Sequence, residues 1–197
     1  LRFGITLSVV IVFLFTILLV ISVRTVQKST AINYSDFCRS LVDAQAQGLS
    51  YRNSKFMQQL RMYTMSDIIN GKSKSDFPST EKIASWLSDH KSVRSGDFYG
   101  VIYCDAATGT GYSDDGKVID VSQEQFFKSI VSGNKSQYID DPALLQNGLA
   151  GYHVCKSVKV NDKVVGFFTA LVTTDMLQDA IDKIKVGEAG YGFLLAS

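Results

Sequence analysis

The residues best suited to nucleophilic, acid–base or metal chemistry in this chain are three cysteines and two histidines. Cys38, Cys104 and Cys155 lie far apart with no CxxC pair, and an odd number cannot form a complete set of disulfides within one chain. His90 and His153 stand singly, with no partner at metal-ligand spacing. We therefore interpret the cysteines as small buried hydrophobic residues and the histidines as surface or sheet residues.

Short motifs that carry catalysis or cofactor binding are absent from the sequence. The GTG stretch at 109–111 lacks the third glycine and the following helix of a dinucleotide fingerprint, so we interpret it as a turn. The DDG stretch at 114–116 lacks the other ligands of a calcium loop, and no GxSxG, HExxH or P-loop pattern occurs. A net charge of +1 gives no basic footprint for nucleic acid. We expect no enzyme activity, no cofactor, no metal site and no nucleic-acid partner.

The first 24 residues predict a membrane anchor. Phe3 to Val23 contains no charge and about sixteen Leu, Ile, Val or Phe residues, flanked by Arg2 and Arg24. Each such residue contributes about −0.3 to −0.6 kcal/mol at a helix centre, so insertion is favoured by about 5 to 9 kcal/mol. A cleaved signal peptide is the alternative, but its apolar region is usually shorter and ends at a small-residue cleavage site. We interpret the segment as an uncleaved transmembrane helix in contact with the lipid bilayer.

Charge counting does not settle which side of the membrane the rest of the chain occupies. Arg24 and Lys28 follow the span whereas only Arg2 precedes it, and long domains translocate largely regardless of such charges. The chain begins with Leu1 and ends directly after the strand-like GYGFLLA, so we expect it to be a fragment of a longer protein.

The residues after the anchor predict one long stem helix. From Thr25 to about Asn70 there is no proline, and apolar residues recur in steps of three and four. They are Tyr34, Phe37, Leu41, Ala44, Phe56, Leu60 and Tyr63. Such a helix of about 45 residues would be nearly 70 Å long. Its apolar stripe must pack on its own domain or on a second copy of the chain, and we expect a homodimer.

The remainder alternates between helical and strand patterns. We expect a helix capped by Ser79 or Thr80 and reaching about His90, a strand over 98–104, a short strand within 105–117 and a helix from Ser122 to Gly133. Two strands at 151–160 and 164–173 flank Asn161-Asp162, which is a hairpin signal. Asp175 would cap a last helix ending at Gly187, before a further strand. The order predicts an α+β fold in which helices flank an antiparallel sheet.

Three stretches resemble the double Cache (dCache) sensor domains of bacterial chemoreceptors, diguanylate cyclases and sensor kinases. They are SQEQFFKSIVSGNKSQYIDDP, NDKVVGFFTALVTTDML and IDKIKVGEAGYGFLLAS. The resemblance implies a PAS-like antiparallel sheet carried by the stem outside the cytoplasmic membrane, in the periplasm or extracellular space. The implied division is an anchor at 1–24, stem and connecting helix at 25–95, a membrane-distal Cache module at 96–175, and the linking helix and first strand of a truncated membrane-proximal module at 176–197.

The resemblance also implies a ligand site. In the amino-acid-binding branch of the family, an arginine and an aromatic residue on the helix hold the ligand carboxylate, while a Tyr-x-Asp and a later aspartate hold its ammonium. Tyr138 and Asp140 match the Tyr-x-Asp and Phe126 the aromatic, but Glu124 stands at the arginine position and Leu171 at the later aspartate. A glutamate cannot pair with the carboxylate of an amino-acid ligand. Glu124 and Asp140 together therefore favour an amine or another cationic ligand over an amino-acid-like one. Tyr103 and Tyr152 complete the candidate ligand-binding residues as further aromatic faces.

The expected function is therefore ligand sensing by a transmembrane receptor, most like a methyl-accepting chemotaxis protein. The same module could instead serve a membrane-bound diguanylate cyclase or histidine kinase, since the output domain is not in this sequence. A third alternative is a membrane-tethered structural module that binds nothing. An exported hydrolase would need a nucleophile and base or a metal cluster, and the sequence shows neither pattern, so we do not expect this class.

Overall fold

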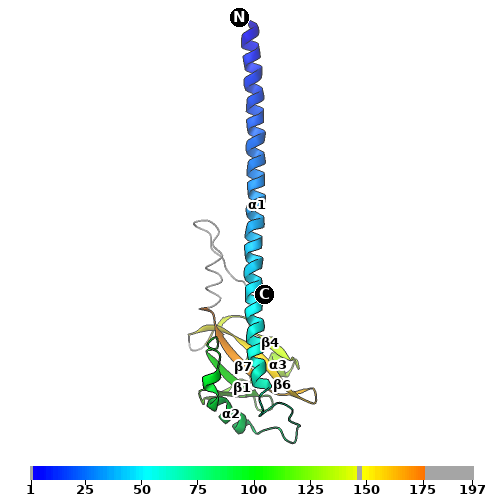
Figure 1. The fold of residues 1–197 in the computed structure, drawn as a ribbon, viewed down its shortest axis with the longest axis vertical. Helices are drawn as coiled ribbons and strands as arrows, with labels where there is room; N and C mark the ends of the chain where they lie inside the picture. Colours follow the sequence, from blue (N-terminus) through cyan, green and yellow to red (C-terminus); the bar gives the residue numbers. More distant parts are fainter. Residues whose placement is uncertain (1, 146–147, 176–197) are drawn as a thin grey trace.

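A single long helix dominates the computed structural model, which describes residues 2–145 and 148–175. Helix α1 runs from Arg2–Thr64, 63 residues, and projects far beyond the rest of the molecule (Figure 1). At 1.5 Å per residue it is about 95 Å long. The predicted anchor and stem are thus one continuous helix, as expected, but it ends about six residues before Asn70. At its end the hydroxyls of Thr64 and Ser66 donate to the carbonyls of Arg61 and Tyr63 and compete with further helical hydrogen bonds.

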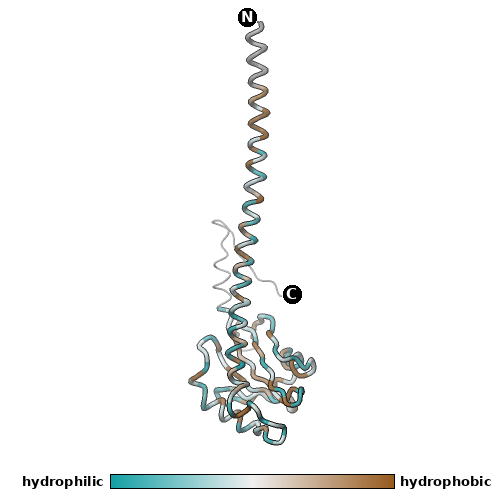
Figure 2. Tube along the Cα trace, turned by 45° about the vertical axis from the view of Figure 1, so that its right-hand side comes forward, coloured by the Kyte–Doolittle hydropathy of each residue, from teal (hydrophilic) through white to brown (hydrophobic). Residues whose placement is uncertain are grey.

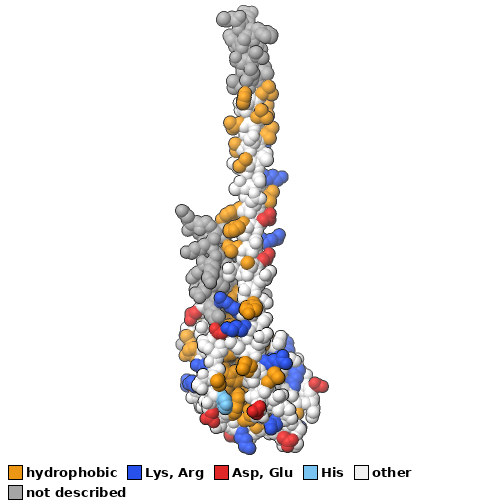
Figure 3. Space-filling view, viewed as in Figure 1, with side chains coloured by type: hydrophobic (Ala, Val, Ile, Leu, Met, Phe, Trp, Pro, Cys, Tyr) orange, Lys and Arg blue, Asp and Glu red, His pale blue; other side chains and the backbone are white. Residues whose placement is uncertain are grey.

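The described part of α1 changes character along its length. Large apolar side chains from Phe13 to Val23 are exposed on all sides of the helix, and Leu18 is 60% exposed (Figures 2 and 3). A helix that is apolar all round is suited to a nonpolar surrounding. Among the described helices, α1 is long and apolar enough to cross a membrane by length and composition.

The sheet is antiparallel throughout its described strands, as predicted. The strands are β1 Gly100–Asp105, β2 Thr110–Ser113, β3 Val118–Asp120, β4 Gln137–Ile139, β5 Ala143–Leu144, β6 Ala150–Val160 and β7 Lys163–Thr173. Their order is β3-β2-β1-β7-β6-β4, and β5 pairs with β6. The two longest strands lie at the centre and form the predicted hairpin. Its turn residues Asn161 and Asp162 have φ of 51° and 62°, the left-handed conformation that a two-residue type I′ turn requires.

Three shorter helical segments complete the described fold. They are α2 Thr80–Asp89, the 3-10 turn η1 Lys91–Val93, and α3 Gln125–Val131. Helix α2 begins after Ser79 as predicted, although the Ser79 side chain makes no capping hydrogen bond. Helix α3 begins later than the predicted Ser122, because the amide of Ser122 donates to the Asp120 side chain at 2.9 Å and residues 122–124 form a turn.

Helices cover both faces of the sheet and make two separate cores. Helices α1 and α2 contact one face, where Leu60, Ile83, Tyr103 and Phe168 are buried. Helix α3 contacts the other face, where Phe126 and Ile130 pack with residues such as Phe167, Cys104 and Cys155. Successive strand residues point to opposite faces, so Tyr103 and Cys104 belong to different cores.

The cysteine prediction is correct at two of three positions. Cys104 and Cys155 are fully buried, and burial raises the pKa of the Cys155 thiol to about 12 and that of Cys104 well above its usual value. Cys38 lies on α1 and is only partly buried. All three are free thiols.

Some predicted elements lie outside the described residues. These are the helix ending at Gly187, the strand after it, and with them the truncated second module at 176–197.

Strands β3 and β5 were not predicted as separate strands. Both are short and exposed, so neither has an apolar alternation that a sequence pattern can show.

Candidate functional site

Asp140 is held at the end of β4 by backbone pairing with β6. Its amide donates to the carbonyl of His153 at 2.8 Å, and two residues earlier Tyr138 lies opposite Cys155. Because β4 and β6 are antiparallel neighbours, residues 138 and 140 both face the α3 side of the sheet. The Tyr-x-Asp that the sequence singled out therefore projects toward the core under α3.

The two carboxylate oxygens of Asp140 have different surroundings. Oδ1 accepts from the Tyr138 hydroxyl at 3.3 Å and from the Asp141 amide at 3.2 Å. Oδ2 faces Nδ1 of His153 at 3.6 Å, longer than a direct hydrogen bond. Asp140 and His153 are 22% and 14% exposed, respectively, so the pair lies at the boundary between core and solvent. Oδ2 is the oxygen with capacity left for a donor from outside the protein.

Phe126 brings α3 onto this pair. Its ring lies 4.5 Å from the His153 imidazole and 6.1 Å from Phe167, and it is almost completely buried. Glu124 precedes α3 as its N-terminal flanking residue and is exposed. An apolar ring, an imidazole and a carboxylate thus meet at one end of α3.

Burial determines the protonation of His153. It lowers the pKa of the imidazole below its ordinary value of 6.5, while the negative charges of Asp140 and, more weakly, Glu124 act in the opposite direction. We conclude that burial prevails and that the imidazole is neutral near pH 7. A neutral imidazole offers one nitrogen as a hydrogen-bond acceptor.

The structure does not bring Tyr103 and Tyr152 into this group. Tyr103 packs against Phe168 at 5.2 Å on the α1 and α2 face, where burial raises its pKa. Tyr152 lies on the same face, and its hydroxyl donates to Asn53 of α1 at 3.0 Å. Phe126, Tyr138 and Asp140 are together on the opposite face, and Glu124 stands near them. A ligand-binding role for the two tyrosines stays a prediction that this placement does not favour.

His153 was not recognised as a candidate in the sequence. It is one residue away from Tyr152 in β6 and pairs with Leu171 of β7, so Asp140, His153 and Leu171 form a row across three strands. The alternation of β6 could have shown that His153 shares a face with Cys155, but its position beside Asp140 depends on the register of β4. Leu171, the member of this row on β7, occupies the later-aspartate position and is apolar.

The arrangement is suited to recognising a cation. It combines one carboxylate with a free oxygen, one neutral imidazole and an aromatic ring. A cation already lies over the Tyr138 ring, since Lys135 Nζ is 5.2 Å from its centroid. Among the described residues, no group of three or more His, Cys, Asp or Glu could hold a metal ion.

The sequence matches no family model and no curated protein. Solved structures do share the fold. The ligand-binding domain of the Pseudomonas aeruginosa amino acid chemoreceptor PctC, in complex with GABA, is 17% identical with a TM-score of 0.57, covering 75% of this chain and 65% of that domain. The ligand-binding domain of Campylobacter jejuni chemoreceptor Tlp3, in complex with 4-methylisoleucine, is 15% identical with a TM-score of 0.55, covering 79% and 63%. That of Pseudomonas fluorescens chemoreceptor CtaA, in complex with L-serine, is 15% identical with a TM-score of 0.54, covering 71% and 59%.

These likenesses establish the fold. The described sheet and helices have the architecture of chemoreceptor ligand-binding domains, as the sequence resemblance predicted. The chain spans less than two thirds of the length of each of these three domains.

Proposed function

We propose that this chain is the extracytoplasmic ligand-sensing part of a bacterial transmembrane receptor, anchored by the start of α1 and most suited to chemotaxis. Two features support this proposal: a fold shared with chemoreceptor ligand-binding domains, and an apolar helix that continues without a break into the sheet module. The proposed division is anchor 1–24, stem and connecting helix 25–95, distal module 96–175 and the start of a second module 176–197. We expect no enzyme activity.

The proposed ligand is a small molecule that carries an ammonium group. The observation that supports it is the Oδ2 of Asp140, which has no hydrogen bond within the described residues and faces a neutral His153 nitrogen at 3.6 Å. One primary ammonium can donate to Oδ2 and, when Nδ1 carries no proton, to His153 as well. With Glu124 exposed nearby and no arginine at the matching position, a ligand carboxylate would lack the bidentate guanidinium partner there, and the nearby Lys135 already lies over the Tyr138 ring.

Strand β6 provides a route from this site to the stem. His153 and Tyr152 are adjacent in β6 and point to opposite faces, and the Tyr152 hydroxyl is bonded to Asn53 of α1. Strands β6 and β7 both contact α1. A ligand that binds one position of β6 more tightly than another would therefore shift α1, and only that difference in affinity can drive a signal.

The stem supports a second part of the proposal, a parallel homodimer. Tyr34 and Phe37 are 51% and 59% exposed on α1 and repeat at helical spacing with Leu41 and Ala44. An exposed apolar stripe of this kind is suited to pairing with an identical helix. In that arrangement two stems would carry the displacement to the membrane together.

Ligand-dependent stabilisation of the full chain in nanodiscs tests this function. The panel contains small primary amines, amino acids and organic acids, and the readout is the thermal unfolding midpoint. A ligand present at 100 times its Kd stabilises the folded state by about 2.7 kcal/mol. We expect an amine to raise the midpoint and organic acids to leave it unchanged.

Asp140→Asn is the decisive variant, with Asp141→Asn as its matched control because Asp141 is an exposed neighbouring carboxylate. A charged hydrogen bond contributes about 1.5–3 kcal/mol, so amine affinity should fall about 10- to 100-fold in Asp140→Asn. Asp141→Asn should bind as the unaltered chain does. Stabilisation by organic acids instead of amines would contradict the ligand class, and a panel without any hit would favour a module that only transmits force.

A further inference from the structure

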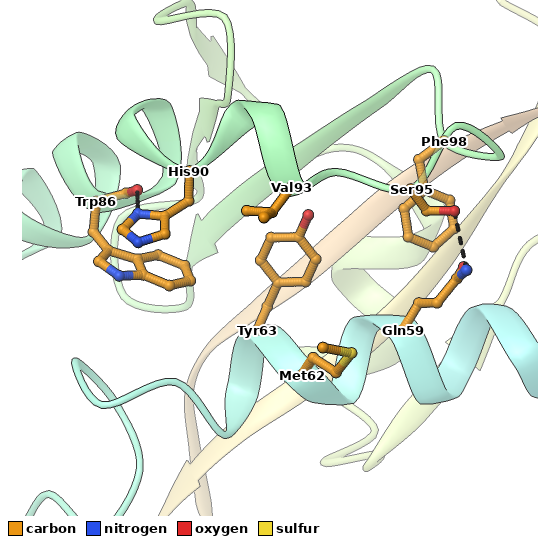
Figure 4. A pocket seen from close by; sticks show the side chains of 8 residues that line it. All are labelled: Gln59, Met62, Tyr63, Trp86, His90, Val93, Ser95 and Phe98. Atoms are coloured by element: carbon orange, nitrogen blue, oxygen red, sulfur yellow. Dashed lines mark hydrogen bonds between the residues drawn. The ribbon is translucent and has the colours of Figure 1, made fainter.

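A cavity of about 430 Å³ lies between α1, α2 and η1, away from the Asp140 site and on the other side of the sheet. Its volume is in the range of small-molecule pockets, about 300–1,000 Å³. Figure 4 shows the Tyr63 ring standing at its centre, with Trp86 and His90 on one side and Phe98 on the other. Helices α1 and α2 and the turn η1 therefore line one cavity with aromatic walls, which we call the aromatic pit.

The aromatic walls are held in place before any ligand arrives. Trp86 and His90 are stacked with ring centroids 4.5 Å apart and a tilt of 24°, and Tyr63 meets Trp86 edge-on at 6.2 Å. The His90 ring is fixed by a 2.7 Å hydrogen bond between Nδ1 and the Trp86 carbonyl, and Phe98 is 3% exposed. A flat apolar molecule would meet rigid aromatic surfaces and would not have to order them.

The cavity has no counter-charge for an ion. No carboxylate, lysine or arginine is among the described residues that line it. The neighbouring Asp97 is paired with Lys55 at 3.0 Å, and Arg94 is paired with Asp114 at 2.6 Å. An ionic ligand would lose its hydration without compensation, so the occupant should be neutral.

One polar atom beside the cavity is unsatisfied. Gln59 lines the pit, and its Oε1 is the buried side-chain oxygen without a hydrogen-bond partner in the described part of the chain. The other end of the amide is used, since Nε2 donates to the Ser95 hydroxyl at 3.0 Å. A buried acceptor left unpaired costs about 1–3 kcal/mol. A ligand that brings an O–H or N–H donor to Gln59, with a rotation of the amide that turns Oε1 toward the cavity, would recover part of that cost.

The shape favours a small molecule over a second helix. On α1 the lining residues are confined to 59–63, little more than one turn. A partner helix would need an apolar stripe over several turns. Met62 and Val93, 73% and 72% exposed, flank the mouth of the cavity.

We propose that this pit is a second binding site, for a neutral small molecule with a flat apolar body and one hydrogen-bond donor. It is distinct from the Asp140 site and independent of it.

The test uses Trp86, the single tryptophan of the chain, as a built-in reporter. The full chain in nanodiscs is titrated with 4-fluorobenzyl alcohol and, separately, with 4-fluorobenzyl methyl ether, which has the same ring but no donor. Empty nanodiscs supply the partition baseline. We expect a saturable change in Trp86 emission with a matching change in the ¹⁹F signal, and several-fold tighter binding of the alcohol.

Three variants locate the effect. Val93→Phe places a larger side chain at the exposed mouth and should weaken binding at least tenfold, while Gln59→Leu should bind alcohol and ether equally. Asp140→Asn should leave both titrations unchanged, whatever it does to amine binding. The proposal is overturned if Trp86 emission does not change up to millimolar probe, if Val93→Phe binds as before, or if emission responds to dilution of the chain and not to the probe, which would assign the pit to a second copy.

Discussion

Asp140 and His153 show how a site can depend on register and not on a motif. Each residue is unremarkable in its own strand, and only the pairing of β4 with β6 brings the carboxylate oxygen within 3.6 Å of the imidazole. The sequence resemblance pointed to Tyr138, Asp140 and Phe126, which the structure brings together, whereas Tyr103 and Tyr152 were chosen as aromatic faces and belong to the opposite core. Aromatic type alone could not separate the two faces, since both cores contain aromatic rings.

At this scale we predict a pH-dependent stability that depends on His153. Burial lowers its pKa in the folded state, so below about pH 6.5 the unfolded chain binds a proton that the folded chain does not. The stability that neutral His153 contributes is fully present above pH 6.5 and is lost as the pH falls toward the lower folded pKa. Thermal unfolding at pH 7.5 and 5.5 should show a smaller loss of stability in His153→Gln than in the unaltered chain.

His90→Gln is the control for that measurement, because His90 is the other histidine and lies exposed at the end of α2. It should retain the pH dependence of the unaltered chain. An equal loss of stability in His153→Gln and the unaltered chain would contradict a buried, neutral His153.

Among the elements, those with a strong period were predictable. The long helix followed from steps of three and four, and the central hairpin from two apolar runs around Asn161-Asp162. The end of α1 and the start of α3 were displaced because hydroxyl and carboxylate side chains make local hydrogen bonds that stop or delay a helix. Those bonds depend on conformation and leave little trace in the sequence.

Strand β7 carries a close contact that yields a second prediction. At Gly166 a Cβ atom would collide with the Tyr103 phenol and lie 2.9 Å from the Cys104 carbonyl oxygen. Gly166→Ala should therefore destabilise the module by about 1–3 kcal/mol, as overpacked core positions do. Unfolding in denaturant, followed by Trp86 fluorescence, measures this change.

Gly96→Ala is the matched control, since nothing lies within 4 Å of a Cβ at that position. It should be neutral or stabilise by about 0.4–1 kcal/mol through the unfolded state. Equal stabilities of the two variants would contradict the prediction, because they would show that the Tyr103 ring can move aside for a Cβ at position 166 without a loss of stability.

At the scale of the whole molecule, two connections follow only from the structure. The site residues and the stem lie on opposite faces of β6, joined by neighbours in one strand. The aromatic pit forms where α1, α2 and η1 meet, from residues 59 to 98 that no motif relates. Sequence patterns identify faces within one element, whereas these features depend on how elements are placed against one another.

The proposed pairing of stems makes a third prediction. Ala44 and Ala46 are both exposed on α1 but point in directions about 160° apart around the helix. In a Cys38→Ser background, Ala44→Cys should form a disulfide-linked dimer under mild oxidation, because Ala44 belongs to the stripe of Tyr34 and Phe37. Ala46→Cys should remain monomeric on a non-reducing gel. Equal cross-linking of both variants, or of neither, would contradict a dimer that pairs through this stripe.

The central claim is that α1 holds the sheet module on the outer side of a membrane. Ser88 is exposed on α2, and the buried Cys104 and Cys155 should not react in the folded protein, so Cys38→Ser combined with Ser88→Cys gives one reporter thiol on the module. The measurement is labelling by a membrane-impermeant maleimide in intact spheroplasts and after permeabilisation. We predict full labelling in intact spheroplasts, with the protein retained in the membrane fraction after carbonate extraction. Labelling only after permeabilisation, or release of the protein by carbonate, would contradict the account.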